Sequence, residues 1–351
     1  MSVNKDLKLS AILIRWYNEH KRNLPWRNTS DPYLIWLSEV ILQQTRVEQG
    51  YSYFNKLVKT FPTVDLLADA EEDDVLKLWE GLGYYSRARN LHAAAKTITN
   101  EYAGIFPRHY KDVLRLKGIG EYTAAAIVSF AYNQPYAVVD GNVYRVLSRV
   151  FAIEEPIDSS GGKKVFAQLA QLLLDESNPG LHNQAIMEFG ALQCVPVSPK
   201  CDSCPAQDMC AAYSRNEINL FPKKAGKQKS RNRYFHYLDI RDGDYMFLHK
   251  RTQKDIWQNL YELPLIETTS EMPVEELSRT DDFRNMFTNS KILRLKYVKE
   301  VKHVLSHQVI YAAFYQVDVS GMEPKGCIKI KIEDVDLYPV SRLVHKYLEI
   351  R

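Results

Sequence analysis

The hydrophobic periodicity of the chain changes once along its length, and this change restricts the folds that it can adopt. Through most of the first two thirds, apolar residues recur at helical spacing, and Gly or Pro separates the runs. In the last third, β-branched and aromatic runs flank Asp242-Gly243, a pair typical of a hairpin turn. A length of 351 residues also exceeds one comfortable hydrophobic core. We therefore predict a multidomain chain in which an all-α part precedes an α+β part.

The predicted domains are an all-α domain over residues 1–220, a basic linker over 221–233 and a smaller α+β domain over 234–351. Asp31 and Pro32 suit the N-cap and the first position of a helix. The runs that predict helices are 34–42, 65–78, 88–99, 122–132, 163–174 and 341–350. The runs that predict strands are 234–240, 245–249 and 309–319.

The positive charge is concentrated in the linker. Six basic residues and no acidic residue stand between Lys223 and Arg233, which is more than the whole formal net charge of +3. Their polar neighbours are typical of a solvated linker, and the same charges also fit a tether that attracts phosphate. The near-neutral total is therefore weak grounds for excluding a nucleic-acid partner.

Composition excludes several other classes of protein. A hydrophobic content of 45% excludes a disordered chain, and no apolar run approaches the ~20 residues that a membrane-spanning helix needs. The N-terminal residues, among them Asn4 and Asp6, do not resemble a signal peptide. We expect a cytoplasmic monomer that is not associated with a membrane.

Four of the five cysteines fall in one window, with the spacing C-x6-C-x2-C-x5-C. In a reducing compartment, such clustering favours metal binding over disulfides. Zinc ribbons normally have two C-x2-C pairs, whereas one pair with longer arms suits a 4Fe–4S cluster. Zinc, or no metal, stays an alternative. The predicted cluster ligands are Cys194, Cys201, Cys204 and Cys210.

A glycine-rich turn joins two predicted helices at residues 114–120, which read LRLKGIG. Gly118 and Gly120 permit close approach to the backbone, and amides at the start of the next helix can face an anion. With its flanking apolar helices, the segment resembles a helix–hairpin–helix motif, which holds duplex DNA through its phosphates. An ordinary helix corner is the alternative.

Two carboxylates are candidates for acid–base chemistry. Glu39 lies beside an apolar helix face, where a buried acid would have a raised pKa and could donate a proton. Asp140 follows an apolar run and precedes a new helix, whose amides favour the anion. A protonated and an ionised carboxyl together suit cleavage through an oxocarbenium-like state. The alternatives are a solvent-reaching glutamate and a simple N-cap.

Several long motifs together resemble the adenine DNA glycosylase family, MutY. They are residues 24–27 (LPWR), 37–45 (LSEVILQQT), 81–90 (GLGYYSRARN), 139–143 (VDGNV) and the four-cysteine window. The match extends from about Leu13 to Cys210. The resemblance implies a six-helix barrel with a 4Fe–4S domain, joined by the linker to a MutT-like (Nudix-like) domain. It also implies removal of adenine mispaired with 8-oxoguanine or guanine in double-stranded DNA, by a bacterial protein that associates with the nucleoid while it acts.

The resemblance also implies roles for individual residues. Glu39 matches the general acid that protonates the flipped adenine, and Asp140 matches the residue that stabilises the sugar cation. Flipping is required because the stack shields the glycosidic bond. Tyr122 and Asn142 match residues that support the intermediate. The adenine-pocket matches are Trp26, Arg27 and Glu188, and the residues matching those that wedge into the duplex around the opposing base are Gln44, Thr45, Leu82 and Tyr84.

Two positions separate this sequence from the related endonuclease III branch. That branch carries a Schiff-base lysine where this chain has Tyr122, and glutamine where it has Glu39. Tyrosine cannot form an imine, so we predict a monofunctional hydrolase. The alternatives are a bifunctional glycosylase/lyase and a non-catalytic iron–sulfur DNA-binding protein.

The C-terminal domain resembles MutT at residues 257–264 (WQNLYELP) but lacks the acidic Nudix pattern G-x5-E-x7-R-E-x2-E-E. We therefore expect it to recognise oxidised guanine, and nucleotide hydrolysis is disfavoured. Ser306 and His307 match the family loop that contacts 8-oxoguanine, although Leu305 replaces its usual aromatic residue. Lys117 replaces the usual proline of the hairpin motif and adds a candidate phosphate contact.

Overall fold

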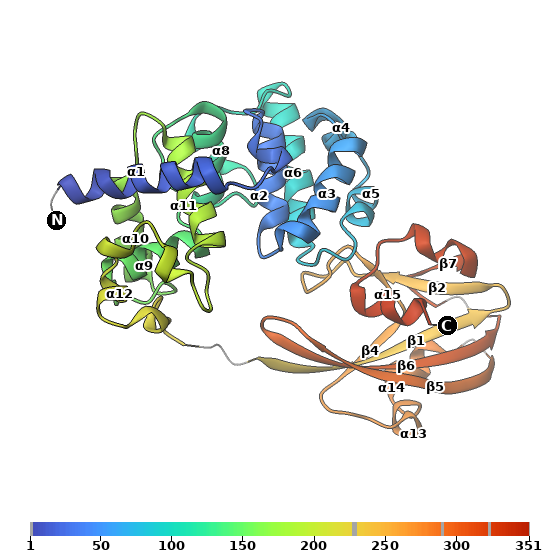
Figure 1. Ribbon diagram of the computed structural model, residues 1–351. Helices are drawn as coiled ribbons and strands as arrows, with labels where there is room; N and C mark the ends of the chain where they lie inside the picture. The colour runs from blue at the N-terminus through green and yellow to red at the C-terminus, as the bar shows by residue number, and fades with distance from the viewer. Residues whose placement is uncertain (1–2, 227–229, 289–290, 322–323, 351) are drawn as a thin grey trace. The chain divides into compact units, whose positions relative to one another are not determined.

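The computed structural model describes residues 3–226, 230–288, 291–321 and 324–350. The chain divides into two compact units, residues 1–68 with 93–226 and residues 69–92 with 227–351 (Figure 1). The second unit therefore contains a segment that the sequence analysis assigned to the helical domain. In the part of the chain that is described, no helix combines the length and the apolar character needed to cross a membrane.

The first unit is all helical. α11 packs against α1, α8 and α9, and α2 packs against α8. The helices that lie wholly or partly in this unit are α1 (Val3–His20), η1 (Pro25–Arg27), α2 (Pro32–Leu42), α3 (Val47–Thr60), α4 (Val64–Asp69), α6 (Ser86–Tyr102), α7 (Tyr110–Arg115), α8 (Glu121–Tyr132), α9 (Gly141–Phe151), α10 (Ser160–Leu173), α11 (Pro179–Leu192), η2 (Cys201–Ser203), η3 (Gln207–Met209), α12 (Ala211–Ser214) and η4 (Ile218–Leu220).

Most of the predicted helices are confirmed. The Asp31 side chain caps α2 by accepting a hydrogen bond from the Tyr33 amide at 2.9 Å. The prediction of a single helix over 65–78 is wrong, because α4 ends at Asp69 and α5 (Glu72–Leu78) begins after a break. Three acidic residues occupy the first turn of α5, and negative charge there favours a helix start at that point.

α11 lies unusually close to the start of α9. A Cβ atom at Gly190 of α11 would stand 2.7 Å from the Asn142 Cβ and 2.9 Å from the Asn142 oxygen. These separations are too short for real atoms, so only glycine permits this packing. The contact fixes the first turn of α9, which contains the predicted catalytic residue Asn142 and follows the N-cap Asp140.

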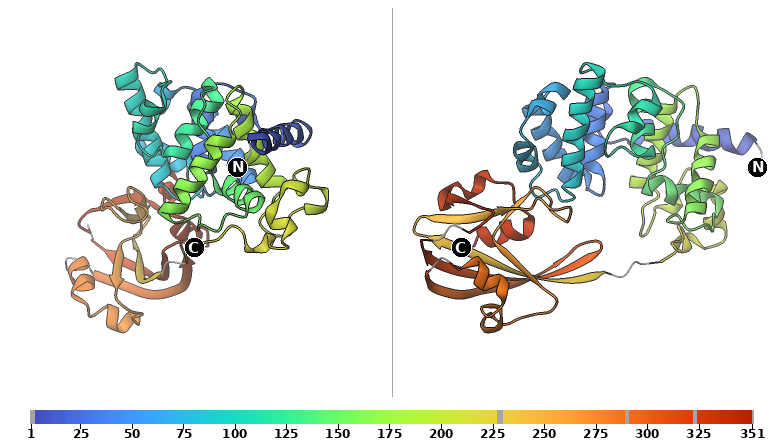
Figure 2. Two further views of the ribbon diagram at one scale, coloured as in Figure 1. Left: turned by 90° about the vertical axis from the view of Figure 1, so that its left-hand side faces the viewer. Right: turned by 180° about the vertical axis from the view of Figure 1, so that it is seen from behind.

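The second unit is built on one sheet, with helices on both faces (Figures 1 and 2). Its strands follow the order β3-β2-β1-β6-β5, with β4 paired to β1 and β7 paired to β2; β1 and β6 run parallel. The elements are α5, β1 (Arg231–Asp242), β2 (Tyr245–Lys250), β3 (Tyr261–Glu262), β4 (Leu265–Thr268), α13 (Val274–Leu277), α14 (Asp281–Met286), β5 (Lys291–Val304), β6 (Gln308–Ser320), β7 (Cys327–Lys331), η5 (Ile332–Leu337) and α15 (Arg342–Leu348).

Side-chain alternation along the strands produces two cores. One face packs with α15 and includes Phe314 and Tyr347, and the other packs with α13 and α14 and includes Phe283 and Val317. The predicted hairpin is confirmed, since Asp242 pairs with Tyr245 across a turn in which Gly243 has a φ of 61°. The predicted closing helix is confirmed as α15.

The basic linker has fewer free charges than its sequence suggests. Lys223 pairs with Glu154 at 3.2 Å, and the Ala225 amide donates to Asp158 at 2.7 Å within the first unit. Arg233 lies in β1 and is only 8% exposed. Two further predicted linker charges, on Lys227 and Lys229, lie outside the described residues.

Candidate active site

The first unit contains a cavity of about 520 Å³, within the ordinary range of small-ligand sites. Its walls come from η1, α2, the loop that follows α2, and the facing ends of α8, α9 and α11. Nine residues singled out from the sequence line it together, although they are scattered over more than 160 positions. They are Trp26, Arg27, Glu39, Gln44, Thr45, Tyr122, Asp140, Asn142 and Glu188.

Glu39 is buried in this cavity and engaged on both carboxylate oxygens. Arg27 donates to Oε1 at 3.1 Å, and the Tyr122 hydroxyl donates to Oε2 at 2.6 Å. Burial, together with the Glu39 and Asp140 carboxylates, raises the pKa of Tyr122 well above its ordinary value, so Tyr122 stays a neutral donor. Burial lowers the pKa of Arg27, but Glu39 and Tyr122 outweigh it, and the guanidinium stays charged. Both partners therefore hold the Glu39 carboxylate in one orientation.

Asp140 is the N-cap of α9. Its Oδ1 accepts from the Asn142 and Val143 amides at 2.9 and 2.8 Å, and its Oδ2 accepts from the Asn142 side chain at 2.8 Å. Burial raises the pKa of Asp140, and these hydrogen bonds offset the rise only in part. The helix-terminal amides thus act as expected, but burial has the larger effect.

The other two predicted adenine-pocket residues, Glu188 and Trp26, also line this cavity. Arg22 holds Glu188 by two side-chain hydrogen bonds of 2.7 and 2.8 Å and by its backbone amide at 3.0 Å. Burial raises the pKa of Glu188, but these bonds outweigh it and lower the pKa overall, so the carboxylate is an anion. The Trp26 indole is 1% exposed and packs edge-on against Phe54. Its Nε1 is buried and has no hydrogen-bond partner among the described residues.

Two of the predicted wedge residues have strained backbones. Gln44 has a φ of 56° and Tyr84 a φ of 48°, a region that residues other than glycine rarely occupy. Gln44 and Thr45 form the loop after α2 and line the first cavity. Leu82 is only 7% exposed in the second unit, so its predicted insertion into the duplex would need it to move outward.

The predicted helix–hairpin–helix turn lies between α7 and α8. Ile119 is buried and anchors the turn, while Gly118 and Gly120 are exposed on either side of it. Gly118 has a φ of 81°, which favours glycine, whereas Gly120 has an ordinary φ of −100°. A Cβ atom at Gly120 would meet no other atom within 4 Å. The fold itself therefore does not require glycine at position 120.

We expect Gly120→Ala to leave the stability of the protein unchanged but to weaken duplex binding. Alanine adopts the observed φ without strain, so the melting temperature should stay within error of wild type. The added methyl group stands where a phosphate would approach the helix amides. Fluorescence anisotropy with a labelled duplex measures the affinity, and Gly161→Ala, also in open space within the first unit, is the control. Equal affinities would show that the turn does not touch DNA.

The four predicted ligand cysteines all line one small cavity, beside Arg149. The Arg149 guanidinium donates to the Cys194 Sγ at 3.4 Å and to the Val195 oxygen at 2.8 Å, and the Cys210 Sγ donates to the Arg149 oxygen at 3.4 Å. All four are free thiols. In the described parts of the chain, no three His, Cys, Asp or Glu side chains converge closely enough to hold a single metal ion.

The second unit contains its own cavity, of about 610 Å³, between segment 81–89, the β2–β3 loop and the β5–β6 turn. Four predicted residues lie around it: Leu82, Tyr84, Ser306 and His307. The Tyr84 hydroxyl and the Ser306 hydroxyl are 2.7 Å apart. The structure thus brings one predicted wedge residue into contact with the predicted 8-oxoguanine loop.

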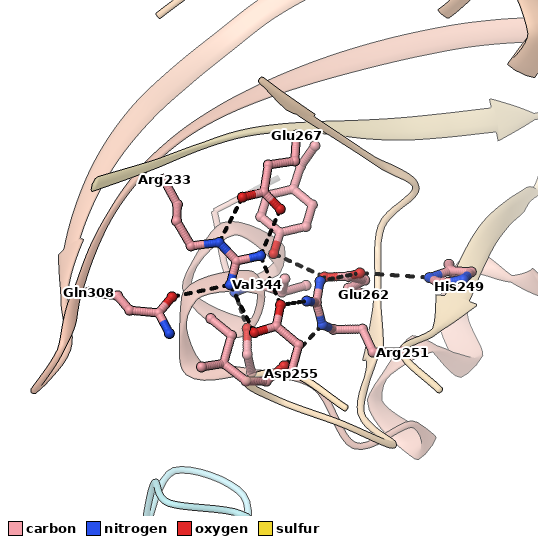
Figure 3. A network of polar contacts seen from close by, with 11 residues as sticks. Arg233, His249, Arg251, Asp255, Glu262, Glu267, Gln308 and Val344 are labelled. Carbon is pink, nitrogen blue, oxygen red and sulfur yellow. Dashed lines mark hydrogen bonds and ion pairs between the residues drawn. The ribbon is translucent and has the colours of Figure 1, made fainter. Parts of the chain in front are cut away.

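A network of ion pairs fixes the loops of this second cavity (Figure 3). Arg233 holds Glu267 by two bonds of 2.7 Å and also contacts Asp255 and Gln308. The Arg251 guanidinium lies 2.8 Å from a carboxylate oxygen of Asp255 and 2.8 Å from one of Glu262. Strand β1 is thereby tied both to the β2–β3 loop and to the first residue of β6.

Sequence reasoning missed three arginines that organise the first unit. Arg22 holds Glu188, and Arg149 holds the cysteine loop. Arg145 donates to the Asn142 Oδ1 at 2.8 Å, to the Gly190 oxygen at 2.6 Å and to the Cys194 oxygen at 2.7 Å. Arg145 and Arg149 are four residues apart and buried on a single face of α9, and a basic pair at that spacing on an apolar helix face was the available signal.

The fold and the cavity define a base-excision DNA repair protein with a helix–hairpin–helix fold. The family model described as "HhH-GPD superfamily base excision DNA repair protein" matches residues 37–173, and that of the NUDIX domain matches residues 236–350. A solved thermostable thymine-DNA glycosylase superposes with a TM-score of 0.57 and 28% identity, covering 61% of this chain and all of that one.

The curated relatives are more specific. An adenine DNA glycosylase of Buchnera aphidicola (subsp. Baizongia pistaciae) is 34% identical, covering 85% of this chain and 83% of the relative. The adenine DNA glycosylase of Mus musculus is 32% identical, covering 89% and 72%. The chain belongs to the adenine DNA glycosylase (MutY) family. It is a DNA-binding DNA glycosylase, a hydrolase of N-glycosyl bonds.

Proposed function

We propose that this enzyme releases adenine paired with 8-oxoguanine or guanine in duplex DNA, after the adenine flips into the first cavity. The supporting observation is that the Tyr122–Glu39–Arg27 group and the capped Asp140 line the same cavity. The groups that an excision through a sugar cation needs are therefore gathered within one small volume.

In this proposal the C1′–N9 bond breaks, and its electron pair moves onto the adenine. Glu39 donates the proton that neutralises the leaving base, and the Asp140 carboxylate faces the cation left on the sugar. Water then adds to C1′ and gives up a proton to the Glu39 carboxylate, which returns Glu39 to its acid form. Because Tyr122 and Arg27 both donate to Glu39, they hold its carboxyl in place while its protonation changes. Trp26 and Glu188, which line the same cavity, would contact the base.

Hydrolysis without strand cleavage is supported by the composition of the cavity. None of the described residues that line it is a lysine, so no amine is placed to form an imine with the sugar. Tyr122 is engaged as a donor to Glu39. A lyase reaction through a Schiff base lacks a nucleophile here.

Recognition of the opposing base is the proposed role of the second unit. The Ser306 hydroxyl bonded to Tyr84 offers both a donor and an acceptor at the edge of the second cavity. His307 is exposed beside it. 8-Oxoguanine differs from guanine by an added N–H and C=O, which such groups can distinguish.

Base release from a panel of mispairs tests the proposed function. We expect adenine release from A:8-oxoguanine and A:G duplexes, with strand breaks only after alkali. Ser306→Ala should reduce the preference for 8-oxoguanine over guanine by about tenfold, the effect of losing one hydrogen bond to a discriminating group. Ser320→Ala, at the exposed end of β6, is the matched control. Strand cleavage without alkali, or release of a different base, would contradict the proposal.

We also propose that the four cysteines bind a 4Fe–4S cluster. Such a cluster takes its thiolate ligands at four separate corners, so thiols spread around one cavity fit it while offering no site for a single ion. Arg149 complements the negative charge of the ligated thiolates. When bound, the cluster would tie together a segment whose helices are the two short 3-10 turns η2 and η3.

Cys204→Ser tests the cluster. We expect the iron content and the visible absorbance of the purified protein to fall by more than half, together with a lower melting temperature. Cys327→Ser, which changes a thiol in β7, should leave both unchanged. Full iron content in the Cys204→Ser protein, or zinc in the wild type, would contradict the assignment.

A further inference from the structure

The second unit has a basic surface that the proposed function does not use. Helix α15 packs on the face of the sheet to which Val301 of β5 contributes. The Lys299 ammonium donates to the Lys346 oxygen at 3.5 Å and lies 6.0 Å from the centre of the Tyr347 ring. Arg342 and Lys346 are exposed and four residues apart, so they lie on the same side of α15.

These cations have no acidic partners in the described parts of the chain. Neither Lys299, Arg342 nor Lys346 forms an ion pair there, whereas Arg233, Arg241 and Arg251 of the same unit do. Like charges at i and i+4 repel each other, and a bound anion would relieve the repulsion. The pKa of His303 in β5 is lowered by burial and also by the positive charges of Lys346 and Arg342. The potential around this side chain is therefore positive.

The wall of the adjoining cavity does not neutralise this charge. Arg342 and His303 line the second cavity together with Arg89 and a single acidic residue, Asp255. Both carboxylate oxygens of Asp255 are already occupied by Arg233 and Arg251 (Figure 3). An anion that pairs with these cations would therefore come from outside the unit.

We propose that Lys299, His303, Arg342 and Lys346 form a binding site for phosphodiester groups of duplex DNA, adjoining the cavity that contains Tyr84 and Ser306. Arg and Lys side chains are the groups that contact phosphates in protein–DNA complexes. The site requires only that the enzyme binds duplex DNA. The site goes beyond the proposed recognition of the mispair, because phosphate binding does not depend on which bases are paired.

The salt dependence of duplex binding tests the site. Each phosphate contact steepens the fall of log K with log salt by about 0.9. Arg342→Gln/Lys346→Gln should therefore flatten the slope by up to about 1.8, so that the loss of affinity between 50 and 200 mM salt becomes roughly tenfold smaller. Fluorescence anisotropy with an undamaged duplex measures this without any reaction.

A matched double variant controls for net charge. Arg284→Gln/Lys302→Gln also removes one Arg and one Lys, both exposed, but on the other face of the sheet, where Phe283 packs and Lys302 lies over Tyr311. This variant should keep the wild-type slope. The charge-conserving variant Arg342→Lys/Lys346→Arg should also keep it. Equal slopes for the two double-Gln variants would overturn the proposal.

The phosphate of a free nucleotide could bind the same cations. Titration calorimetry with dGMP distinguishes a nucleotide site from a site for duplex DNA. If wild type binds dGMP, the Arg342→Gln/Lys346→Gln variant does not, and the duplex slope is unchanged, the site serves a nucleotide and the proposal is overturned. Failure of the proposed function would be recognised separately. In that case the wild-type protein would release no adenine, and this result does not depend on the salt dependence of binding.

Discussion

Glu39→Gln is expected to lower the single-turnover rate of adenine release by about 10²–10⁴-fold, the usual contribution of a general acid. Glutamine fills the same space, and its carbonyl oxygen can still accept from Tyr122 or Arg27, but it has no proton to give. Mispair binding should therefore stay within a few-fold of wild type. Rapid-quench excision assays and anisotropy on the same duplex measure the two quantities.

The structure also predicts a secondary effect of this change. The Arg27 guanidinium, whose side chain is 13% exposed, would lose its anionic partner inside the protein. We expect the free energy of unfolding to fall by about 1–3 kcal/mol. The matched control is Glu101→Gln, at an exposed position on α6, which should change neither the rate of adenine release nor the free energy of unfolding. Excision that survives in Glu39→Gln would show that another group supplies the proton.

Asp140→Asn is expected to slow excision by about 10²–10³-fold, because it removes the charge that faces the sugar cation. Asparagine is as good an N-cap as aspartate, so α9 should keep its first turn. The change therefore removes the charge while the helix start is kept. Circular dichroism and single-turnover kinetics separate the two effects, and Asp158→Asn, an exposed aspartate in the loop before α10, is the control.

The pKa of Asp140 gives this variant a pH signature. Burial raises the pKa of Asp140 in the folded protein, so acidification removes the anion at a higher pH than for an ordinary aspartate. Wild-type excision should therefore decline early on the acid side, and the Asp140→Asn profile should lack that decline. Ionising a carboxyl whose folded pKa is raised destabilises the fold. The variant should accordingly be at least as stable as wild type near neutrality, with the difference vanishing towards about pH 4.

The fold was predictable wherever a local pattern was strong. The Asp31-Pro32 cap and the Asp242-Gly243 turn each specify their structure within a few residues, and both are confirmed. The break between α4 and α5 was missed because the apolar spacing continues across it. The assignment of residues 69–92 to the second unit depends on tertiary contacts such as Lys250 with Asp73, at 2.7 Å, which no local pattern encodes.

The candidate site was predictable through motifs and not through geometry. Glu39, Tyr122 and Asp140 come from three separate segments, and only the resemblance to a known family indicated that they belong together. Arg22 was missed because its partner Glu188 lies 166 positions away. The free charge of the linker was overestimated for the same reason, since Arg233 finds Glu267 only in the folded sheet.

Gly190 has a consequence for how this enzyme tolerates sequence change. It contacts no reacting group, yet one methyl group there would collide with the backbone and the Cβ of Asn142, the residue that donates to Asp140. The collision would displace the start of α9 while leaving its buried apolar contacts largely in place. We therefore expect that no residue other than glycine is tolerated at position 190. A genetic screen for inactive alleles should recover substitutions there, and the substituted proteins should still accumulate in cells in a folded form.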